Sequence, residues 1–365
     1  MNPDLAQPVD RFLAEILEQP GVMRASAAGL DGQREGIARV GELAVRGRHF
    51  ILTGMGSSYD ACLAAASVLA RRGVVATTVN TAELLHFRTA ALTERTPVIA
   101  VSQSGSSAEP VRLAERLAAA QPRPPLVTVT NGADNPLARL ADVSLDSLAG
   151  VEESPSTKTF AASLVVLRAL CEAVVPAAAA GPFDAGAAVA AAAADAGRAA
   201  AAAERLLSDR QGLADRVRAW CDERPSIVML GRGTARAAAE MGALILKEAA
   251  RRQAESLDTA EFRHGPLELA GPELAVAVVS TEPATVSLDA RLASELVAHG
   301  ASVMMIAAQG GPATAGASIG IDELHPLLAP AVAVIPLQLL AWRLALEGGR
   351  DPGRLTRASK VTTTE

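Results

Sequence analysis

Short apolar runs rich in β-branched residues alternate along this chain with longer stretches of helical patterning. One helical pattern begins near Ser58 and another begins after Ser107. The runs with the length and composition of strands are residues 49–54 (HFILTG), 74–79 (VVATTV), 97–102 (PVIAVS) and 125–130 (PLVTVT). This alternation is typical of a parallel sheet covered by helices, so we predict an α/β fold.

The second half of the sequence repeats the first. Residues 51–73 and 228–253 share, in the same order, a strand, a Gly-x-Gly turn, a hydroxyl residue and an Ala-rich helix. Further along, residues 80–87 (NTAELLHF) are echoed by residues 258–265 (DTAEFRHG). We therefore predict two copies of one α/β unit, linked by a helix in the Ala-rich tract at residues 185–207.

The two Gly-x-Gly turns do not complete a dinucleotide-binding motif. That motif needs a third glycine, and the corresponding positions hold Tyr59 in the first copy and Arg236 in the second. The Gly-Lys-Ser/Thr of a P-loop is also absent from the sequence. What remains is the expectation of two helix N-termini at the carboxyl edge of a sheet, where α/β proteins bind their ligands.

Composition and charge narrow the choice of partners. The 365 residues are 50% hydrophobic and 20% charged, which is enough for two domains with cores of their own. A net charge of -6 and the lack of any Lys/Arg-rich run argue against a nucleic-acid partner. The three cysteines, Cys62, Cys171 and Cys221, are scattered without metal-ligand spacing, so we expect no metal and no cofactor.

Neither a signal peptide nor a membrane span is predicted. The opening residues MNPDLAQPVDRF lack the basic end and apolar run of a signal peptide. The longest apolar tract, residues 185–203, is mostly alanine and is interrupted by Asp195 and Arg198. We expect a cytoplasmic protein without a membrane partner.

Residues 102–107 (SQSGSS), which we call the serine loop, join a predicted strand to a predicted helix. Hydroxyls and helix N-terminal N–H groups can surround a phosphate dianion without a cationic side chain, and Gly105 lets the backbone turn inward. The alternative is that Ser107 caps its helix and the other residues fill a polar turn. The matching loop of the second copy, VVSTEPAT, contains Glu282 and Pro283, which would repel an anion and remove a donor. We therefore predict phosphate binding in the first copy only.

Several motifs in order resemble the double sugar isomerase (SIS) domain family, in particular the isomerase part of glucosamine-6-phosphate synthase and the stand-alone SIS-type glucosamine-6-phosphate deaminases. The motifs are GMGSSYDA, SQSGSS, PSTKTF, LGRG, LILKEAARRQAESLDTAEFRHGPLEL and the tail LTRASKVTTTE. The resemblance implies two flavodoxin-like, five-stranded parallel sheets with helices on both faces, in a protein that forms homodimers with shared active sites. The expected division is a helical leader (1–30), a first SIS domain with a linker helix (31–200), a second SIS domain (201–347) and a tail that closes over the active site (348–365).

The resemblance also implies roles for individual residues. Glu248 matches the general base that moves a proton between C1 and C2, His264 matches the histidine that opens the sugar ring from the partner subunit, and Lys360 matches the tail lysine that closes over the substrate. Residues implied to bind the sugar phosphate are Ser57, Ser58, Ser102, Gln103, Ser104, Ser107 and Ser156.

The expected chemistry suits these side chains. Aldose-to-ketose conversion removes a proton beside a carbonyl or imine, which needs a carboxylate base and a second group that shuttles protons to oxygen. Each residue also has a structural alternative. Glu248 could pair with the basic residues that flank it, His264 could cap a turn, and Lys360 could lie in a disordered end.

Two features depart from the synthase pattern. Ile245 stands where the synthase has a lysine, so one cationic contact near the reacting oxygens is missing. The chain starts Met1-Asn2-Pro3 and enters the similarity almost at once, so we expect no glutaminase activity.

Three functions remain open from the sequence. The first is an enzyme that isomerises and deaminates an amino-hexose 6-phosphate such as glucosamine 6-phosphate. The second is a related SIS enzyme, either a deglycase for phosphorylated Amadori products or an aldose–ketose phosphosugar isomerase. The third is a catalytically silent sensor of a sugar phosphate, which we rank last because no effector segment is visible in the sequence and the acid–base pair is intact.

Overall fold

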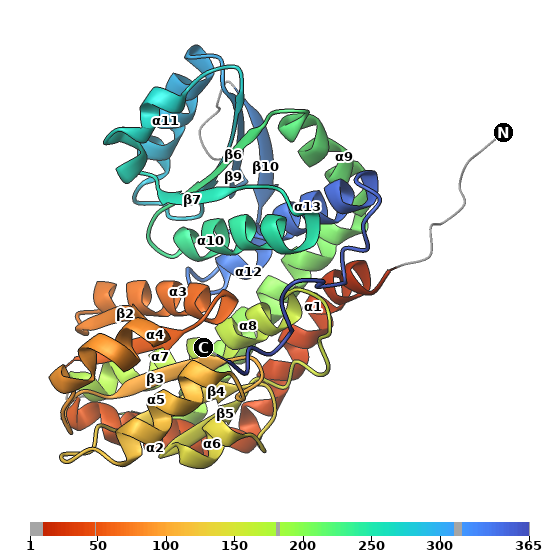
Figure 1. Cartoon of the computed structure of the whole chain (residues 1–365). Helices are drawn as coiled ribbons and strands as arrows, with labels where there is room; N and C mark the ends of the chain where they lie inside the picture. Colours follow the sequence, from red (N-terminus) through yellow and green to blue (C-terminus); the bar gives the residue numbers. More distant parts are fainter. Residues whose placement is uncertain (1–9, 48, 180–182, 310–315, 365) are drawn as a thin grey trace.

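The computed structural model of the chain describes residues 10–47, 49–179, 183–309 and 316–364. It contains two α/β units stacked one above the other, with the C-terminal tail running back between them (Figure 1). Parts of the expected domains lie outside the described residues, namely 1–9 of the leader, 48 and 180–182 of the first domain, 310–315 of the second domain and 365 of the tail.

Five parallel strands form the first sheet, in the order β2-β1-β3-β4-β5. Its inner strands are buried on both faces because helices cover both sides, which explains their continuous apolar runs. The strands are β1 (Phe50–Gly54), β2 (Ala76–Asn80), β3 (Val98–Ser102), β4 (Leu126–Thr130) and β5 (Val143–Asp146).

The second sheet has the same order when it is numbered within its own copy, β10-β9-β8-β6-β7, and is also parallel throughout. The predicted fold class and the predicted repeat are therefore confirmed. The strands are β6 (Ser226–Gly231), β7 (Glu255–Asp258), β8 (Leu274–Ser280), β9 (Ser302–Ala308) and β10 (Ala317–Ile321).

Helices surround both sheets. The Ala-rich tract forms a helix as predicted, α8, which packs against the leader helix α1 and against α7. The helices of the first half are α1 (Arg11–Gly29), α2 (Arg34–Arg46), α3 (Ser57–Arg71), α4 (Thr81–Glu83), α5 (Ala108–Ala118), α6 (Pro136–Leu140) and α7 (Lys158–Ala178). Those of the second half are α8 (Ala185–Ser208), α9 (Arg210–Cys221), α10 (Ala235–Ile245), α11 (Val286–Ala298), α12 (Ala329–Ala333) and α13 (Ile335–Glu347).

Short 3₁₀ and π segments complete the secondary structure. Two of them are π-helical, η2 (Leu84–Arg88) and η4 (Leu246–Ala250). The 3₁₀ segments are η1 (Asp31–Gln33), η3 (Thr89–Ala91), η5 (Glu261–Arg263) and η6 (Pro266–Leu269).

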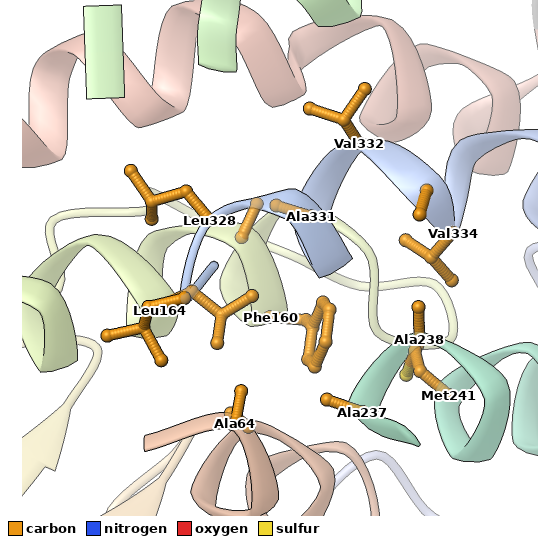
Figure 2. Packing of buried hydrophobic residues seen from close by; sticks show 14 of the residues in the cluster. Ala64, Phe160, Leu164, Ala237, Ala238, Met241, Leu328, Ala331, Val332 and Val334 are labelled. Atoms are coloured by element: carbon orange, nitrogen blue, oxygen red, sulfur yellow. The ribbon is translucent and has the colours of Figure 1, made fainter. Parts of the chain in front are cut away.

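Helices α3 and α10 pack against each other between the two sheets (Figure 1). Figure 2 shows why they approach closely: Ala64 of α3 and Ala237 and Ala238 of α10 present small side chains, and Phe160 of α7 fills the space beside them. One continuous core therefore joins the two units, and α3 and α10 hold fixed positions relative to each other.

Two segments, Lys158–Ala178 and Ala329–Glu347, are long and apolar enough to cross a membrane. Their most apolar windows are 83% and 89% buried inside the protein. Their hydrophobicity is accounted for by the core they form.

Candidate active site

A pocket lies between the carboxyl edge of the first sheet, the end of α10 and the C-terminal tail. Its volume is about 220 Å³, below the roughly 300–1,000 Å³ of sites for drug-sized ligands. It opens where the neighbouring strands β1 and β3 lead to opposite sides of the sheet, the usual ligand position in such folds. Nine of the ten predicted site residues line it: Ser57, Ser58, Ser102, Gln103, Ser104, Ser107, Ser156, Glu248 and Lys360.

The serine loop is held in a tight inward turn. Gly105 has a φ of +61°, and a Cβ on it would lie 2.0 Å from the side-chain oxygen of Asn135, so only glycine fits. Ser102 Oγ accepts a hydrogen bond from Gly105 N at 3.2 Å, and Ser104 Oγ accepts one from Ser106 N at 3.1 Å. Because each serine oxygen accepts a backbone N–H, each O–H proton remains available for a ligand.

Ser107 begins α5 without capping it. It is the N-cap residue, but its side chain makes no capping hydrogen bond. The first backbone N–H of the helix, on Ala108, donates instead to the carbonyl of Thr362 in the tail at 3.0 Å. The Ser107 hydroxyl is therefore open to the pocket, which disfavours the simple capping role that the sequence left possible.

Ser57 and Ser58 form the first turn of α3. The preceding Gly56 has a φ of +53°, and Gly54 packs so closely that a Cβ would lie 2.8 Å from the backbone of Ser58. These glycines bring the N-terminus of α3 to the pocket that the serine loop also lines.

Gln103 and Ser156 complete the polar wall of the pocket. The backbone carbonyl of Gln103 accepts a hydrogen bond from Asn131 N at 3.0 Å, which fixes the loop at this residue. Ser156 belongs to the strap, which we define as residues 147–157 between β5 and α7. Its hydroxyl lies 3.0 Å from Thr159 Oγ1.

Glu248 lies on the π-turn η4, directly after α10. The wider turn is followed by Arg251 in a left-handed conformation with φ +51°, a backbone irregularity of a kind frequent at functional sites. Burial raises the pKa of Glu248, and the positive charge of Lys360 is the strongest effect in the opposite direction. The flanking arginines point elsewhere, Arg251 to Thr356 Oγ1 at 2.7 Å and Arg252 to the carbonyl of Arg224 at 2.8 Å. Glu248 is thus a half-buried carboxylate in the pocket rather than a partner of its basic neighbours.

The tail lysine is bound to the strap. Lys360 Nζ donates to Glu152 Oε2 at 2.8 Å and to the carbonyl of Ser154 at 2.6 Å. The Glu152 side chain is fully buried, and it also accepts from the backbone N–H groups of Thr157 and Thr159 at 2.8 and 3.0 Å. A buried carboxylate with several donors is a strong binding site for an ammonium group, so the tail is fastened over the pocket.

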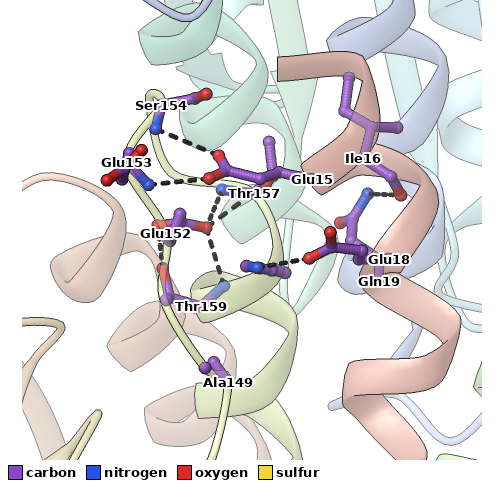
Figure 3. Close-up of polar contacts among 12 residues, drawn as sticks. Glu15, Ile16, Glu18, Gln19, Ala149, Glu152, Glu153, Ser154, Thr157 and Thr159 are labelled. Carbon is purple, nitrogen blue, oxygen red and sulfur yellow. Dashed lines mark hydrogen bonds and ion pairs between the residues drawn. The ribbon is translucent and has the colours of Figure 1, made fainter. Parts of the chain in front are cut away.

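A second acid from the leader helix supports the strap. Glu15 of α1 accepts hydrogen bonds from the backbone N–H groups of Glu153 and Ser154 at 2.8 and 3.1 Å (Figure 3). Burial, and after it the nearby charge of Glu152, raises the pKa of Glu15. Neither Glu15 nor Glu152 was predicted from the sequence as a site residue. The adjacent acids just before PSTKTF were the one local signal for Glu152.

Asp60 is another titratable group near the site that was not predicted from the sequence. It lies in the first turn of α3 and is 7% exposed, and its Oδ2 has no hydrogen-bond partner. Burial raises the pKa of Asp60 well above its ordinary value of 3.8, and the charges of Glu240 and Glu248 add to the effect. This carboxyl therefore resists ionisation next to the proposed base.

Asp60→Asn is expected to stabilise the protein increasingly as pH rises above 3.8. Below that pH the carboxyl is protonated in both the folded and the unfolded chain; above it, only the unfolded chain ionises freely, so wild-type stability falls until the folded-state pKa is reached. The slope is at most about 1.4 kcal/mol per pH unit. Thermal unfolding of both proteins between pH 4 and 8 measures the difference, and a pH-independent difference would contradict the raised pKa.

Two predicted features fall outside the pocket. Ile245 is fully buried in the core, so no cation reaches the site from that position. His264 is exposed at the end of η5, where its backbone N–H bonds to the carbonyl of Glu261, and it does not line the pocket of its own chain. Its exposure leaves it available to a second subunit.

The arrangement combines an anion site with acid–base groups. The serine loop, the start of α3, Glu248 and Lys360 all line one pocket. In the part of the chain that the structure describes, no three His, Cys, Asp or Glu side chains come together as metal ligands would. The pocket can hold a small polar anion and move a proton within it.

The chain is similar to proteins of one known family, in sequence and in fold. The family model for the SIS domain matches residues 43–173 and 222–347. A glutamine–fructose-6-phosphate aminotransferase (isomerizing) of Pyrobaculum aerophilum is 31% identical over 358 residues, and the match covers 97% of this chain and 57% of the relative. This chain therefore spans a little over half the length of that relative.

Two solved structures show the shared fold. The C-terminal domain of glucosamine-fructose-6-phosphate aminotransferase from Francisella tularensis has a TM-score of 0.82 at 22% identity, with 96% of this chain and 98% of that chain covered. Glucosamine-6-phosphate deaminase from Thermotoga maritima has a TM-score of 0.73 at 18% identity, with 96% and 99% covered.

Proposed function

Because the chain belongs to the SIS domain family of phosphosugar isomerases, we propose that it isomerises and deaminates an amino-hexose 6-phosphate. The reaction converts glucosamine 6-phosphate and water into fructose 6-phosphate and ammonia. The observation that carries the proposal is that Glu248 and the serine loop line the same pocket. The names of the similar aminotransferase and deaminase support this choice of substrate class.

The proposed mechanism begins with the phosphate in the serine loop. Ser102 and Ser104 donate their O–H groups to phosphate oxygens, and the N-terminus of α3 adds its partial positive charge. After ring opening, Glu248 removes the proton from C2 and returns it to C1, so the C2 amine becomes a C2 imine. Water adds to this imine and ammonia leaves, which gives the ketose phosphate.

Glu248 and Lys360 have complementary tasks in this scheme. Burial raises the pKa of Glu248 and so strengthens it as a base. Lys360, fastened beside it by Glu152, places a positive charge near the oxygen that gains negative charge during proton transfer. The tail also covers the pocket, which limits access of water to the reactive intermediate.

We further propose a homodimer in which His264 of the partner subunit opens the sugar ring. His264→Ala is then expected to reduce turnover of the closed-ring sugar, and an equal mixture of Glu248→Gln and His264→Ala proteins should regain activity. Mixed dimers contain one site with both intact groups, so full exchange yields up to about a quarter of wild-type activity by random pairing. Exchange is verified with differently tagged subunits, and no recovery after exchange would contradict the shared site.

Replacing Ser102 and Ser104 together with alanine should weaken phosphosugar binding by roughly 3–6 kcal/mol, because two hydrogen bonds to a charged group are lost at about 1.5–3 kcal/mol each. Calorimetry with glucosamine 6-phosphate and with glucosamine measures the effect. The matched control is Ser294→Ala, which removes a hydroxyl bonded only within α11 to the carbonyl of Ala290. Equal wild-type affinity for glucosamine with and without its phosphate would contradict the phosphate site.

A panel of phosphorylated sugars distinguishes the remaining functions. Ammonia and ketose phosphate released together from glucosamine 6-phosphate support the proposed deaminase. Ketose formation from a simple aldose phosphate, or sugar phosphate released from an Amadori product, indicates the isomerase or the deglycase instead. Tight binding without turnover of any compound indicates a sensor.

A further inference from the structure

The loop after β8 is the counterpart of the serine loop in the second copy. Strand β3 ends at Ser102 and Ser107 is the N-cap of α5; in the second copy, with the same spacing, β8 ends at Ser280 and Thr285 is the N-cap of α11. In this register Glu282 takes the position of Ser104. The sequence suggested that Glu282 would repel an anion there.

In the structure, the Glu282 carboxylate turns inward and binds the start of α10. Its Oε1 accepts hydrogen bonds from Thr234 N at 3.1 Å and from Thr234 Oγ1 at 2.6 Å. Thr234 is the N-cap residue of α10, yet its side chain does not cap the helix because the hydroxyl is directed to Glu282. The Glu282 side chain is only 6% exposed.

The glycine turn beside this carboxylate matches the one in the first copy. Gly233 has a φ of +58°, close to the +53° of Gly56. A Cβ on Gly233 would lie 3.1 Å from Glu282 Oε1, so the turn passes close to the carboxylate. Both copies thus keep a turn and helix N-terminus suited to an anion.

We propose that Glu282 is an internal ligand that fills an anion site of the second copy, in the place that a phosphate takes in the first copy under the proposed function. The helix N-terminus of α10 supplies backbone and hydroxyl donors, and a carboxylate of the same chain supplies the negative charge. Without Glu282 this site accepts a small free anion, a carboxylate such as formate or an inorganic phosphate.

The internal ligand also ties the two units together. Glu282 Oε2 pairs with Arg71, the last residue of α3. Helix α3 begins with Ser57 and Ser58, and α10 leads directly into the turn that carries Glu248. Glu282 is therefore a positioning residue, which holds the C-terminal end of α3 and the N-terminal end of α10 in place. Its effect on catalysis rests on the proposed function.

The test compares the melting temperatures of Glu282→Ala and the wild type with and without formate. The variant is expected to unfold about 2–6 °C below the wild type, as for the loss of a helix N-cap in a chain of this size. Formate should raise the melting temperature of the variant more than that of the wild type, because it occupies the vacated site. Formamide, which has the same shape without the charge, and sodium chloride at equal ionic strength should not. The matched control is Glu295→Ala, which removes a carboxylate of α11 that pairs with Arg263 of η5. It should show no formate response beyond that of the wild type.

Two outcomes would overturn the proposal. One is a variant with the melting temperature of the wild type; the other is an equal formate response in both proteins. If Glu282→Ala does not fold, Glu282→Gln keeps the shape and removes the charge; it should melt below the wild type, and a wild-type melting temperature would again overturn the proposal. None of these measurements needs turnover, so they stand even if the proposed reaction fails. Where turnover is present, formate should restore the kcat of Glu282→Ala in parallel with its stability.

Discussion

Glu248→Gln is expected to reduce kcat by roughly 10²- to 10⁴-fold, the contribution of a well-placed general base. The amide keeps the shape of the side chain but cannot accept the C2 proton. Binding of glucosamine 6-phosphate should change little, because in the proposed scheme the serine loop, and not Glu248, holds the phosphate. Steady-state kinetics and calorimetry on the same preparation separate the two effects.

The control for this substitution is Glu240→Gln, on helix α10, which directly precedes the π-turn that carries Glu248. Glu240 forms an ion pair with Arg236 and does not line the pocket, so the same chemical change there should leave kcat nearly unaffected. If Glu248→Gln turns over substrate at the wild-type rate, the proton is moved by another group. A wild-type acid limb of kcat at the ordinary carboxyl pKa of 4.5 would also count against Glu248, because burial raises its pKa above that value.

Lys360→Ala is expected to lower kcat by about 10²-fold or more, the size of effect found when one preorganised electrostatic donor is removed from an active site. It should also shift the acid limb of the pH profile to higher pH. Lys360 is the strongest influence that lowers the pKa of Glu248, so the Glu248 carboxyl holds its proton more tightly without it. Rate measurements from pH 5 to 9 test both expectations.

Removal of residues 356–365 should reproduce the loss of catalysis with much of the phosphate affinity intact. The tail contributes Lys360 and the carbonyl of Thr362, whereas the serine loop keeps its own turn hydrogen bonds. The matched control for Lys360→Ala is Arg357→Ala, because Arg357 is an exposed cation on the same tail. A truncated protein with full activity would show that the tail takes no part in the reaction.

Local patterns in the sequence were sufficient for the fold and for much of the pocket. The serine loop, the Gly-x-Gly turns and the repeated order of elements depend on residues close together in the chain, and the two sheets confirm the repeat. Glu248 and Lys360 were named through family resemblance, and the structure places both in one pocket. Their roles in catalysis stay predictions until the variants are measured.

Contacts between distant segments were beyond what the pattern could predict. Glu15 meets the strap across 138 residues, and Lys360 meets Glu152 across 208 residues. The residues of the π-turn that carries Glu248, LKEAA, are ordinary helix formers, so their composition gives no sign of the wider turn. The inward turn of Glu282 depends on Thr234 and Arg71, each on a different element, so the sequence pattern around Glu282 could not predict it.

The bond between Lys360 and Glu152 has a consequence during biosynthesis. Domains fold as units while the ribosome elongates the chain, those nearer the N-terminus first. The strap and its buried carboxylate are made 208 residues before the lysine that binds to them, so the first sheet can form around a Glu152 that still lacks its cation. The nascent chain therefore carries an uncovered pocket until the segment with Lys360 has been made.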